Sequence, residues 1–364
     1  MNITIIAGAR PNFMKIAPII DAIIMKKNKG LDIHYRLVHT GQHYDKNLSD
    51  TFFEELHIPF PDINLEVKSG SQAEQAAAIM IGFEKELEAN PCDLVIVVGD
   101  VNSTMACAIV AKKMGVEVAH VEAGIRSGDM AMPEEINRIV TDSLTDYFFT
   151  TSTYANENLE KIGVSKNNIF FVGNVMIDTL LKNESRFKKP TIWDTLDLTP
   201  KHYMVITLHR PSNVDEENVL KKLLEQIVTL ANNYPIIFPV HPRTKKLLEN
   251  LHLNFDNLHY VDPMSYLEFN FLVKNALAVL TDSGGITEET TVMNIPCMTL
   301  RDSTERPETC DIGTNILVGN DPEKLKSAFN ILFSGNWKHG NTPKFWDGHA
   351  AMRIMNYIIG IYGL

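Results

Sequence analysis

The chain has 364 residues, of which 45% are hydrophobic and 22% charged, a balance typical of globular proteins and not of disordered ones. This length exceeds what one small core needs and predicts two domains of ordinary size. The formal net charge of −11 argues against nucleic acid or an anionic membrane as the main partner. No basic leader segment precedes the first apolar run, which is too short to span a bilayer, so we expect a cytoplasmic protein.

Short apolar runs alternate with helical patterns through the first half of the chain. Residues 3–7 predict a strand that breaks at Gly8, and residues 13–25 predict the helix behind it. The continuous apolar run at 93–98 is typical of a strand buried on both faces. Further strands are expected at 34–39, 116–121 and 147–151. Further helices are expected at 72–89, in the segment that follows Asp100 and ends at Met114, and in a segment that begins at Pro133.

A polar, proline-containing stretch at 183–201 interrupts this alternation and predicts an interdomain linker. The pattern then resumes, which predicts two Rossmann-like domains, each with a mostly parallel sheet. The strands expected in the second half are 203–208, 236–240, 259–261 and 276–280. The helices expected there are 216–232, 244–250, 266–275 and 286–293.

Three carboxylates follow strand ends or begin a helix in the first half, namely Asp100, Glu122 and Glu134. Ligands of open α/β sheets bind beyond the carboxyl ends of the strands. Carboxylates gathered in a closed site push their pKa values apart, which gives one acid and one base. A structural interpretation also exists, with Asp100 as a helix cap and Glu134 as a partner of the helix dipole and of Arg138. For Glu135 the structural interpretation is favoured.

The second half contains a candidate anion site. Ser283, Gly284 and Gly285 lie where a strand passes into a helix, so their backbone N–H groups face outward at the positive end of the helix dipole. A cap by Ser283 or Asp282, with glycines for a tight turn, is the alternative. Arg10 and Lys15 oppose the dipole of the first predicted helix, a placement that is explained if they are aimed at an anion. The alternative, and the commoner explanation for a single arginine, is an exposed side chain whose charge extends into solvent.

Neither half contains the G-x-G-x-x-G pattern of dinucleotide sites, and no His, Cys and Asp cluster has metal-ligand spacing. We therefore expect no NAD and no metal. The four cysteines are scattered, which indicates a reducing compartment. Without further evidence, His43, His120 and His241 are interpreted as hydrogen-bonded structural histidines.

Taken together, these motifs resemble the UDP-N-acetylglucosamine 2-epimerases of bacteria and archaea along the whole chain. The motifs that carry the resemblance are Gly8-Ala9-Arg10-Pro11 with Lys15, Thr40-Gly41-Gln42-His43, Gly99-Asp100, His120-Val121-Glu122-Ala123-Gly124 with Arg126, Pro133-Glu134-Glu135 with Asn137-Arg138, Gly173-Asn174, His209-Arg210, His241-Pro242, Asp282-Ser283-Gly284-Gly285 with Glu288-Glu289, Arg301-Asp302, Glu305-Arg306-Pro307-Glu308, and Gly313-Thr314.

The resemblance implies a GT-B fold, two Rossmann-like domains facing across a cleft. Residues 1–180 would form the first, completed by a C-terminal helix at about 347–364, and residues 181–346 the UDP-binding second. It implies reversible inversion at C2 of UDP-GlcNAc to UDP-ManNAc without a cofactor, by elimination and re-addition of UDP through 2-acetamidoglucal, for surface polysaccharide synthesis. A homodimer is also implied.

The resemblance also assigns roles to individual residues. Acid and base functions would belong to Asp100, Glu122 and Glu134, with His209 and Arg10 acting near the phosphates. The remaining residues implied to bind the UDP-sugar are Lys15, Phe269, Ser283, Gly284, Gly285, Glu289 and Arg306. Residues of the types that the family uses for allosteric activation are Gln42, His43, Arg210 and His241.

Two features leave effector binding and substrate specificity open. After Gln42-His43 the chain continues Tyr44-Asp45-Lys46-Asn47, where many members have Arg-x-Met, which puts effector binding in doubt. The stretch from Gln42 to Glu55 also resembles epimerases of UDP-2,3-diacetamido sugar acids. A hydrolysing epimerase that releases ManNAc and UDP would fit the motifs too, and a GT-B glycosyltransferase is disfavoured by the packed carboxylates.

Overall fold

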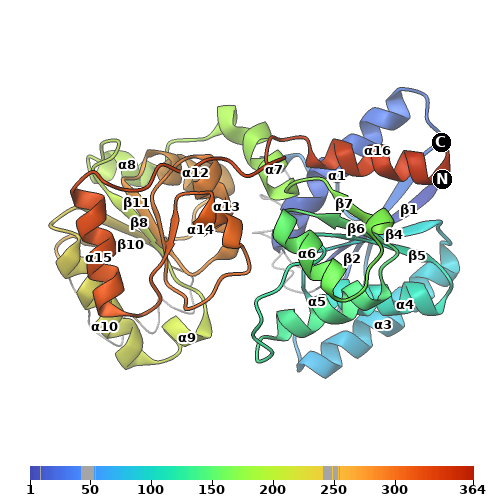
Figure 1. Ribbon diagram of the computed structural model, residues 1–364, viewed down its shortest axis with the longest axis horizontal. Coiled ribbons are helices and arrows are strands. Elements are labelled where there is room, and N and C mark those ends of the chain that lie inside the picture. Colours follow the sequence, from blue (N-terminus) through green and yellow to red (C-terminus); the bar gives the residue numbers. More distant parts are fainter. Residues whose placement is uncertain (9, 42–52, 54, 241–247, 249–252, 254) are drawn as a thin grey trace. The chain divides into compact units, whose positions relative to one another are not determined.

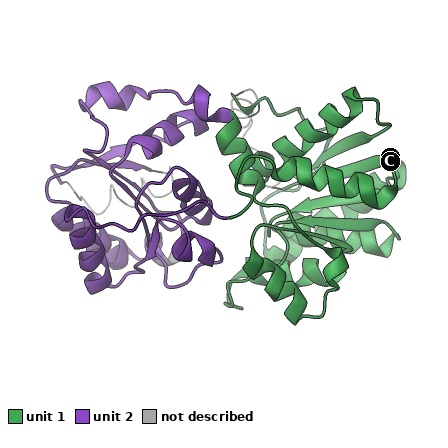
Figure 2. Cartoon of the chain, turned by 45° about the horizontal axis from the view of Figure 1, so that its top comes forward, with its two compact units in different colours: residues 1–182, 344–364 green, residues 183–343 purple. Residues whose placement is uncertain are grey.

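The chain divides into two compact units, each built from a parallel sheet with helices on it (Figure 2). A computed structural model describes residues 1–8, 10–41, 53, 55–240, 248, 253 and 255–364. Unit 1 comprises Met1–Lys182 and Lys344–Leu364, and unit 2 comprises Asn183–Pro343. The two α/β units confirm the predicted fold class. None of the helices in the described ranges combines the length and hydrophobicity that crossing a membrane requires.

The sheet of unit 1 has seven parallel strands in the order β3-β2-β1-β4-β5-β6-β7 (Figure 1). Its centre is fully apolar because helices cover both faces, and all five residues of β4 are buried, as the apolar run predicts. The strands are β1 Asn2–Ala7, β2 His34–His39, β3 Ile63–Asn64, β4 Leu94–Val98, β5 Glu117–Val121, β6 Tyr147–Thr150 and β7 Ile169–Phe171.

The helices of unit 1 begin with the signals that local chemistry prefers. Ser71 and Glu74 form a capping box at the start of α3, and Pro133 is the first residue of α5. The helices are α1 Arg10–Asn28, α3 Gln72–Ala89, α4 Asn102–Lys113, α5 Pro133–Leu144, α6 Thr153–Lys161, the 3₁₀ helix η1 Lys166–Asn168, α7 Val175–Asn183 and α16 Ala350–Tyr362.

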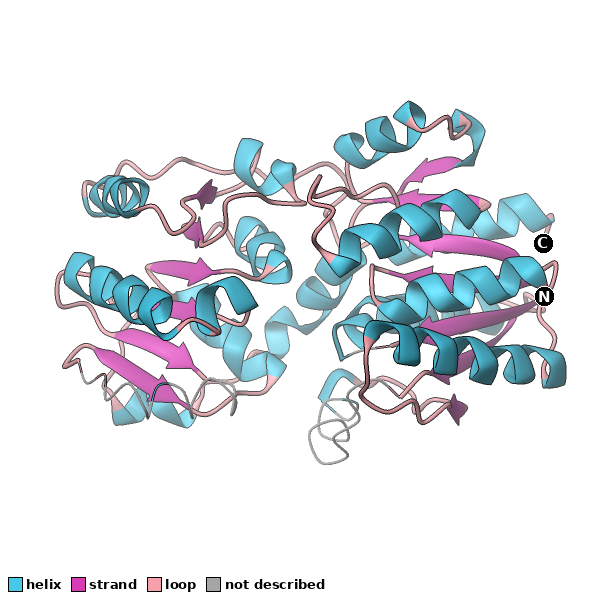
Figure 3. Ribbon diagram, turned by 90° about the horizontal axis from the view of Figure 1, so that it is seen from below, coloured by secondary structure: helices cyan, strands magenta, loops and turns pink. Residues whose placement is uncertain are grey.

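Unit 2 repeats this design, with helices around a sheet (Figure 3). Its six parallel strands have the order β10-β9-β8-β11-β12-β13. The strands are β8 Met204–Thr207, β9 Ile236–Pro239, β10 Leu258–Val261, β11 Ala278–Thr281, β12 Cys297–Thr299 and β13 Asn315–Leu317. The helices are η2 Glu184–Arg186, α8 Thr191–Thr195, α9 Pro211–Val214, α10 Glu217–Leu230, α12 Tyr266–Asn275, α13 Gly284–Val292, α14 Pro307–Asp311 and α15 Pro322–Phe333.

The strand order of each sheet reverses once, between β1 and β4 in unit 1 and between β8 and β11 in unit 2. Loops that leave the two strands at such a point diverge to opposite faces of the sheet and open a crevice at the carboxyl ends. The motifs after β1 and β4, and those after β8 and β11, therefore lie at the ligand-binding position of each unit.

The last helix, α16, returns to unit 1 and packs against α1, as the sequence predicts. Asp178 of α7 accepts the backbone N–H groups of Ala350 at 3.0 Å and Ala351 at 2.7 Å, and so caps the first turn of α16. Burial raises the pKa of the Asp178 carboxyl to about 6, although the two N–H donors oppose this shift. A side chain 172 residues away in sequence thus fixes where α16 begins.

Candidate active site

The carboxyl ends of β4 and β5 bring Gly99 and Glu122 together in unit 1. The strands are in register at Val98 and Val121, and the Gly99 N–H donates to the Val121 carbonyl at 3.0 Å. Both Gly99 and Glu122 have φ at +71°, a conformation that costs a side chain energy and that only Gly adopts freely. This turn points the buried Glu122 carboxylate toward Gly99, where a Cβ would stand 3.4 Å from Oε2.

Lys15 of α1 supplies the charge opposite Glu122. Its Nζ lies 2.5 Å from Oε2 of Glu122, and only 14% of the Lys15 side chain is exposed. Positive charge in the first turns of a helix is unfavourable by itself, and the ion pair with a buried carboxylate explains why a lysine is kept there. Arg10 is the first residue of the same helix.

Asp100 is held from α5, which begins at Pro133. Arg138 Nη2 contacts Asp100 Oδ2 at 2.5 Å, and Arg138 Nη1 contacts Glu135 Oε2 at 2.8 Å. Asn137 donates to the Asp100 carbonyl at 2.9 Å. The Asp100 side chain is 30% exposed, so a ligand can reach it. Glu134 lies in the first turn of α5 and is partly exposed.

Glu135 has a structural role, as the sequence favoured. Its carboxylate accepts the N–H groups of Ser127 at 2.9 Å and Gly128 at 3.0 Å. Burial would raise its pKa, but these donors and Arg138 outweigh burial and leave the pKa of Glu135 below its usual value. The residue is therefore an anion that anchors the loop before α5.

A buried histidine and aspartate lie behind these carboxylates. His120 Nδ1 is 2.7 Å from Asp142 Oδ1, and Nε2 is 2.9 Å from the Gly99 carbonyl. Asp142 also contacts Arg126 at 2.6 Å and accepts the Gly124 N–H at 3.1 Å. Burial opposes ionisation, but the hydrogen bond and charge of His120, with Arg126, leave the pKa of Asp142 lowered. The interpretation of His120 as a hydrogen-bonded structural residue is confirmed.

In unit 2 the turn after β11 passes directly into α13. Ser283 is the N-cap but makes no side-chain capping bond, and its N–H donates to Thr281 Oγ1 at 3.0 Å. A Cβ at Gly284 would meet nothing within 4 Å, so the backbone there is open to a ligand. The first N–H groups of α13 thus remain oriented for an anion. Beside this turn, His209 Nδ1 lies 2.7 Å from Asp282 Oδ1.

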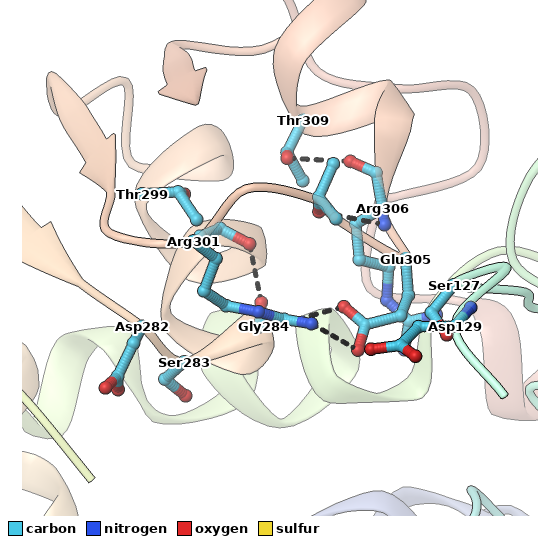
Figure 4. A network of polar contacts seen from close by, with 12 residues as sticks. Ser127, Asp129, Asp282, Ser283, Gly284, Thr299, Arg301, Glu305, Arg306 and Thr309 are labelled. Atoms are coloured by element: carbon cyan, nitrogen blue, oxygen red, sulfur yellow. Dashed lines mark hydrogen bonds and ion pairs between the residues drawn. The ribbon is translucent and has the colours of Figure 1, made fainter. Parts of the chain in front are cut away.

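The segment between β12 and α14 holds its charges in pairs (Figure 4). Arg301 makes a two-point contact with Glu305, at 2.8 and 2.9 Å. The Nε of Arg306 contacts Glu288 of α13, and Arg306 is only 9% exposed. Arg306, the residue that precedes α14, therefore links α14 to α13.

Glu289 of α13 is buried and accepts the hydroxyl of Tyr266 at 2.7 Å. Burial raises the pKa of Glu289 to about 7; the tyrosine opposes this shift and the charge of Glu288 adds to it. Phe269, one turn after Tyr266 on α12, is partly buried against the core beneath β8 and β11. The hydrogen bond between Tyr266 and Glu289 therefore connects α12 to α13.

The structure brings together Asp100, Glu122 and Lys15 in unit 1, and His209, Ser283 and Gly284 in unit 2. Gln42, His43 and His241 lie outside the described residues, whereas the Arg210 N–H donates to Asp282 at 3.0 Å. Sequence reasoning did not single out two further residues of these networks, Asp142 and Tyr266. It considered Asp282 only as a possible helix cap and named Glu288 only within a motif. An acidic residue in the last turn of a helix opposes the dipole, and that unfavourable placement was a usable signal for Asp142.

Comparison with known proteins decides the family. Residues 25–359 match the family model described as UDP-N-acetylglucosamine 2-epimerase. The UDP-N-acetylglucosamine 2-epimerase of Methanocaldococcus jannaschii is 42% identical over 373 residues, covering 98% of this chain and 99% of that protein. The chain belongs to the UDP-N-acetylglucosamine 2-epimerase family, a family of isomerases.

Solved structures and a sister enzyme agree with this family. A crystal structure of the Methanocaldococcus jannaschii enzyme in complex with UDP-GlcNAc and UDP has a TM-score of 0.88 at 41% identity, covering 99% of this chain and 100% of that one. The UDP-2,3-diacetamido-2,3-dideoxy-D-glucuronate 2-epimerase of Pseudomonas aeruginosa is 36% identical over 362 residues, covering 98% of this chain and 99% of the relative. The family thus includes more than one sugar specificity.

Proposed function

We propose that this chain interconverts UDP-GlcNAc and UDP-ManNAc by inverting C2, through elimination of UDP and its re-addition to 2-acetamidoglucal. The observation that carries the proposal is the gathering of carboxylates at the ends of β4 and β5 in a chain that matches this family along almost all of its residues. The relative from Methanocaldococcus jannaschii, solved with UDP-GlcNAc and UDP, supports these two ligands for this chain.

The elimination needs a base and a stabilised leaving group. The base removes the proton from C2, the C2–H electron pair becomes the C1=C2 bond, and the C1–O bond breaks with its pair going to UDP. Because C2–H is a weak acid, its loss must be coupled to departure of the diphosphate, which nearby positive groups and N–H donors stabilise. Re-addition of UDP with protonation from the opposite face gives the other epimer.

We assign the proton transfers to unit 1 and the diphosphate to unit 2. Asp100, Glu122 and Glu134 provide the acid and base functions, and Lys15 is the cation beside Glu122. Lys15 orients the carboxylate of Glu122 and Arg138 that of Asp100, so each carboxylate is held in place by a cation of its own.

In unit 2, the N–H groups of Ser283, Gly284 and Gly285 bind phosphate oxygens at the α13 terminus, with His209 beside them. Glu289 takes the ribose hydroxyls, and Phe269 the uracil. Arg10 and Arg306 complete the binding of the UDP-sugar. Effector binding by Gln42, His43, Arg210 and His241 remains part of the proposal.

The test is to incubate the protein with UDP-GlcNAc in D2O and to follow the sugar by proton NMR. We expect a UDP-linked manno product with deuterium at C2, because the abstracted proton exchanges with solvent. Free ManNAc would show hydrolysis instead, and unchanged UDP-GlcNAc would contradict the proposal. A parallel reaction with a UDP-2,3-diacetamido sugar acid tests whether this chain accepts the substrate named for the relative from Pseudomonas aeruginosa.

We also propose that the chain forms a homodimer through an apolar face of unit 1. Helix α4 packs against both α3 and α5, and the outer side of this layer exposes Ile81, Ile136 and Ile139. Exposed isoleucines at i and i+3 of one helix are unusual unless another surface covers them. Sedimentation should show a dimer that Ile139→Asp weakens, and a monomeric wild type would contradict this interface.

A further inference from the structure

The strand register of unit 2 places His209 beside Asp282. Strands β8 and β11 pair in parallel with Thr207 opposite Thr281, so the residues that follow the two strands leave the sheet side by side. Asp282 is completely buried, whereas the His209 side chain is 54% exposed. The pair therefore has one buried member and one that faces solvent, at the strand-order reversal of this sheet.

Five contacts converge on the Asp282 carboxylate. The His209 N–H reaches both oxygens, at 3.1 and 3.2 Å, and the Arg210 N–H reaches Oδ2 at 3.0 Å. Asn213 Nδ2 donates to Oδ2 at 2.9 Å and also to the Leu300 carbonyl at 3.1 Å. The fifth contact is His209 Nδ1, at 2.7 Å from Oδ1. Both the backbone and the ring of His209 are thus fixed by one side chain.

The N–H donors around Asp282 favour its ionised form. Burial works against the charge, but the hydrogen bond and charge of His209, the Asn213 amide and the Arg210 N–H leave its pKa below the usual value. An ionised carboxylate has no proton to give, so Nδ1 of His209 must be the donor. The other ring nitrogen, Nε2, then lies on the opposite side of the ring from Asp282.

We infer that Asp282 is a positioning residue that fixes the ring of His209 with its proton on Nδ1 and presents Nε2 to the substrate. This inference rests on the proposed function, in which His209 acts beside the departing diphosphate. When Nε2 carries the second proton, the ring donates to a diphosphate oxygen while Asp282 keeps its charge and takes up no proton. A carboxylate behind a histidine stabilises that imidazolium.

A purely structural role is the competing explanation, because Asp282 also holds the loop from His209 to Asn213. The two explanations differ in what they predict for the ring. If Asp282 only holds the loop, its removal and the removal of another loop contact should have similar consequences. If it sets the ring, only its own removal should change the protonation pattern of His209.

The first test is NMR of the free protein with ¹⁵N-labelled histidine rings, in which His209→Asn identifies the His209 signals among the 12 histidines. In the wild type we expect the Nδ1 signal of a protonated nitrogen at every pH at which the ring is neutral. A neutral ring with its proton on Nε2 would overturn the inference, and this measurement needs no variant of Asp282 to fold. Asn213→Ala, the matched loop control, should keep the wild-type ring pattern, whereas Asp282→Asn should lose it.

The second test is a double-mutant cycle on UDP-GlcNAc turnover. Asp282→Asn should lower kcat/KM roughly 10- to 100-fold, as removal of a carboxylate behind a functional histidine does in metal sites. In the His209→Asn background the same change should have almost no further effect. If the loss of kcat/KM in the double variant equalled the product of the two single losses, the inference would be overturned. Near-normal kcat/KM in Asp282→Asn would also overturn it. If the wild type fails to epimerise UDP-GlcNAc while its ring carries the Nδ1 proton, the proposed function fails and the Asp282 geometry stands.

Discussion

Each unit contains a histidine that contacts an aspartate at 2.7 Å, yet the two pairs differ in what surrounds them. In unit 1 the His120 side chain is 1% exposed, and both ring nitrogens have acceptors, Asp142 and the Gly99 carbonyl. In unit 2 the His209 side chain is 54% exposed and only Nδ1 faces its aspartate. The same two side chains therefore hold a loop in one unit and leave the ring open to solvent in the other.

The enclosed pair links two elements of unit 1. Each ring nitrogen of His120 faces an acceptor, Asp142 Oδ1 at 2.7 Å and the Gly99 carbonyl at 2.9 Å. The ring thereby ties the Gly99 turn to α5, which carries Asp142. The comparison teaches that burial of the second ring nitrogen, and not the His and Asp pairing itself, separates a ring closed to ligands from a ring that a ligand can reach.

The largest expected effect concerns the exposed pair. His209→Asn should reduce kcat by roughly two to four orders of magnitude, the usual contribution of a positioned acid or base group. Its unfolding free energy should change by less than about 1 kcal/mol, because the ring is largely exposed. Steady-state kinetics and urea unfolding measure the two quantities. A variant that loses stability but keeps its turnover would erase the distinction between the pairs.

The enclosed pair should behave in the opposite way. His120→Gln leaves the buried Asp142 without its histidine partner and should lower the unfolding free energy by about 3 kcal/mol. Urea unfolding checks this value, with His34→Gln as the control, since that histidine also contacts an aspartate but is about half exposed. Equal stability of the two variants would mean that enclosure of the pair has no energetic consequence.

The pH dependence of stability should distinguish a carboxylate paired with a histidine from one that caps a helix through backbone N–H groups. Asp142 has a lowered pKa, so its contribution is present above the unfolded value near 3.8 and is lost as pH falls below it. Asp178 has a pKa raised to about 6, so its contribution is greatest below about pH 4 and is lost as pH rises through 6.

The measurement is the difference in unfolding free energy between the wild type and Asp178→Asn. This difference should fall by roughly 2 kcal/mol between pH 4 and pH 7, the linkage expected for a shift of this size. For Asp142→Asn the difference should instead stay constant over that range and shrink only at lower pH. A rising difference for Asp178→Asn would show that the two N–H donors outweigh burial.

Much of the fold was predictable because strands and helices leave local signals. The predicted strand 34–39 and the helices 72–89 and 266–275 agree with β2, α3 and α12. The helix expected at 286–293 in fact begins at Gly284, because the two glycines that the sequence pattern assigned to a turn form the first turn of the helix. The predicted helix at 244–250 lies outside the described residues.

The stretch at 183–201, interpreted as a linker, contains a short helix, α8. The boundary between the units falls at the first residue of this stretch, Asn183. Its polar composition hid the partly buried Ile192 and Trp193, which pack on the core of unit 2. Two apolar residues in one turn are too few for a periodic signal, so local pattern could not find this helix.

The site was harder to predict than the fold because its supports are distant in sequence. His209 and Asp282 are 73 residues apart, and His120 and Asp142 are 22 apart. Strand ends could be located from local pattern, and so could the side chains that follow them. Which strand lies beside which depends on the sheet order, and only that order shows that Asp282 is behind His209 and that Lys15 faces Glu122.

The return of α16 to unit 1 has a consequence for synthesis on the ribosome. Unit 2 is complete once Pro343 has emerged, whereas unit 1 still lacks the helix that packs on α1 and is capped by Asp178. The apolar side of α16, with Ile354, Met355 and Ile358 buried, is made after all of unit 2. During synthesis, unit 2 can therefore be complete in sequence before unit 1, although the strands of unit 1 are made first.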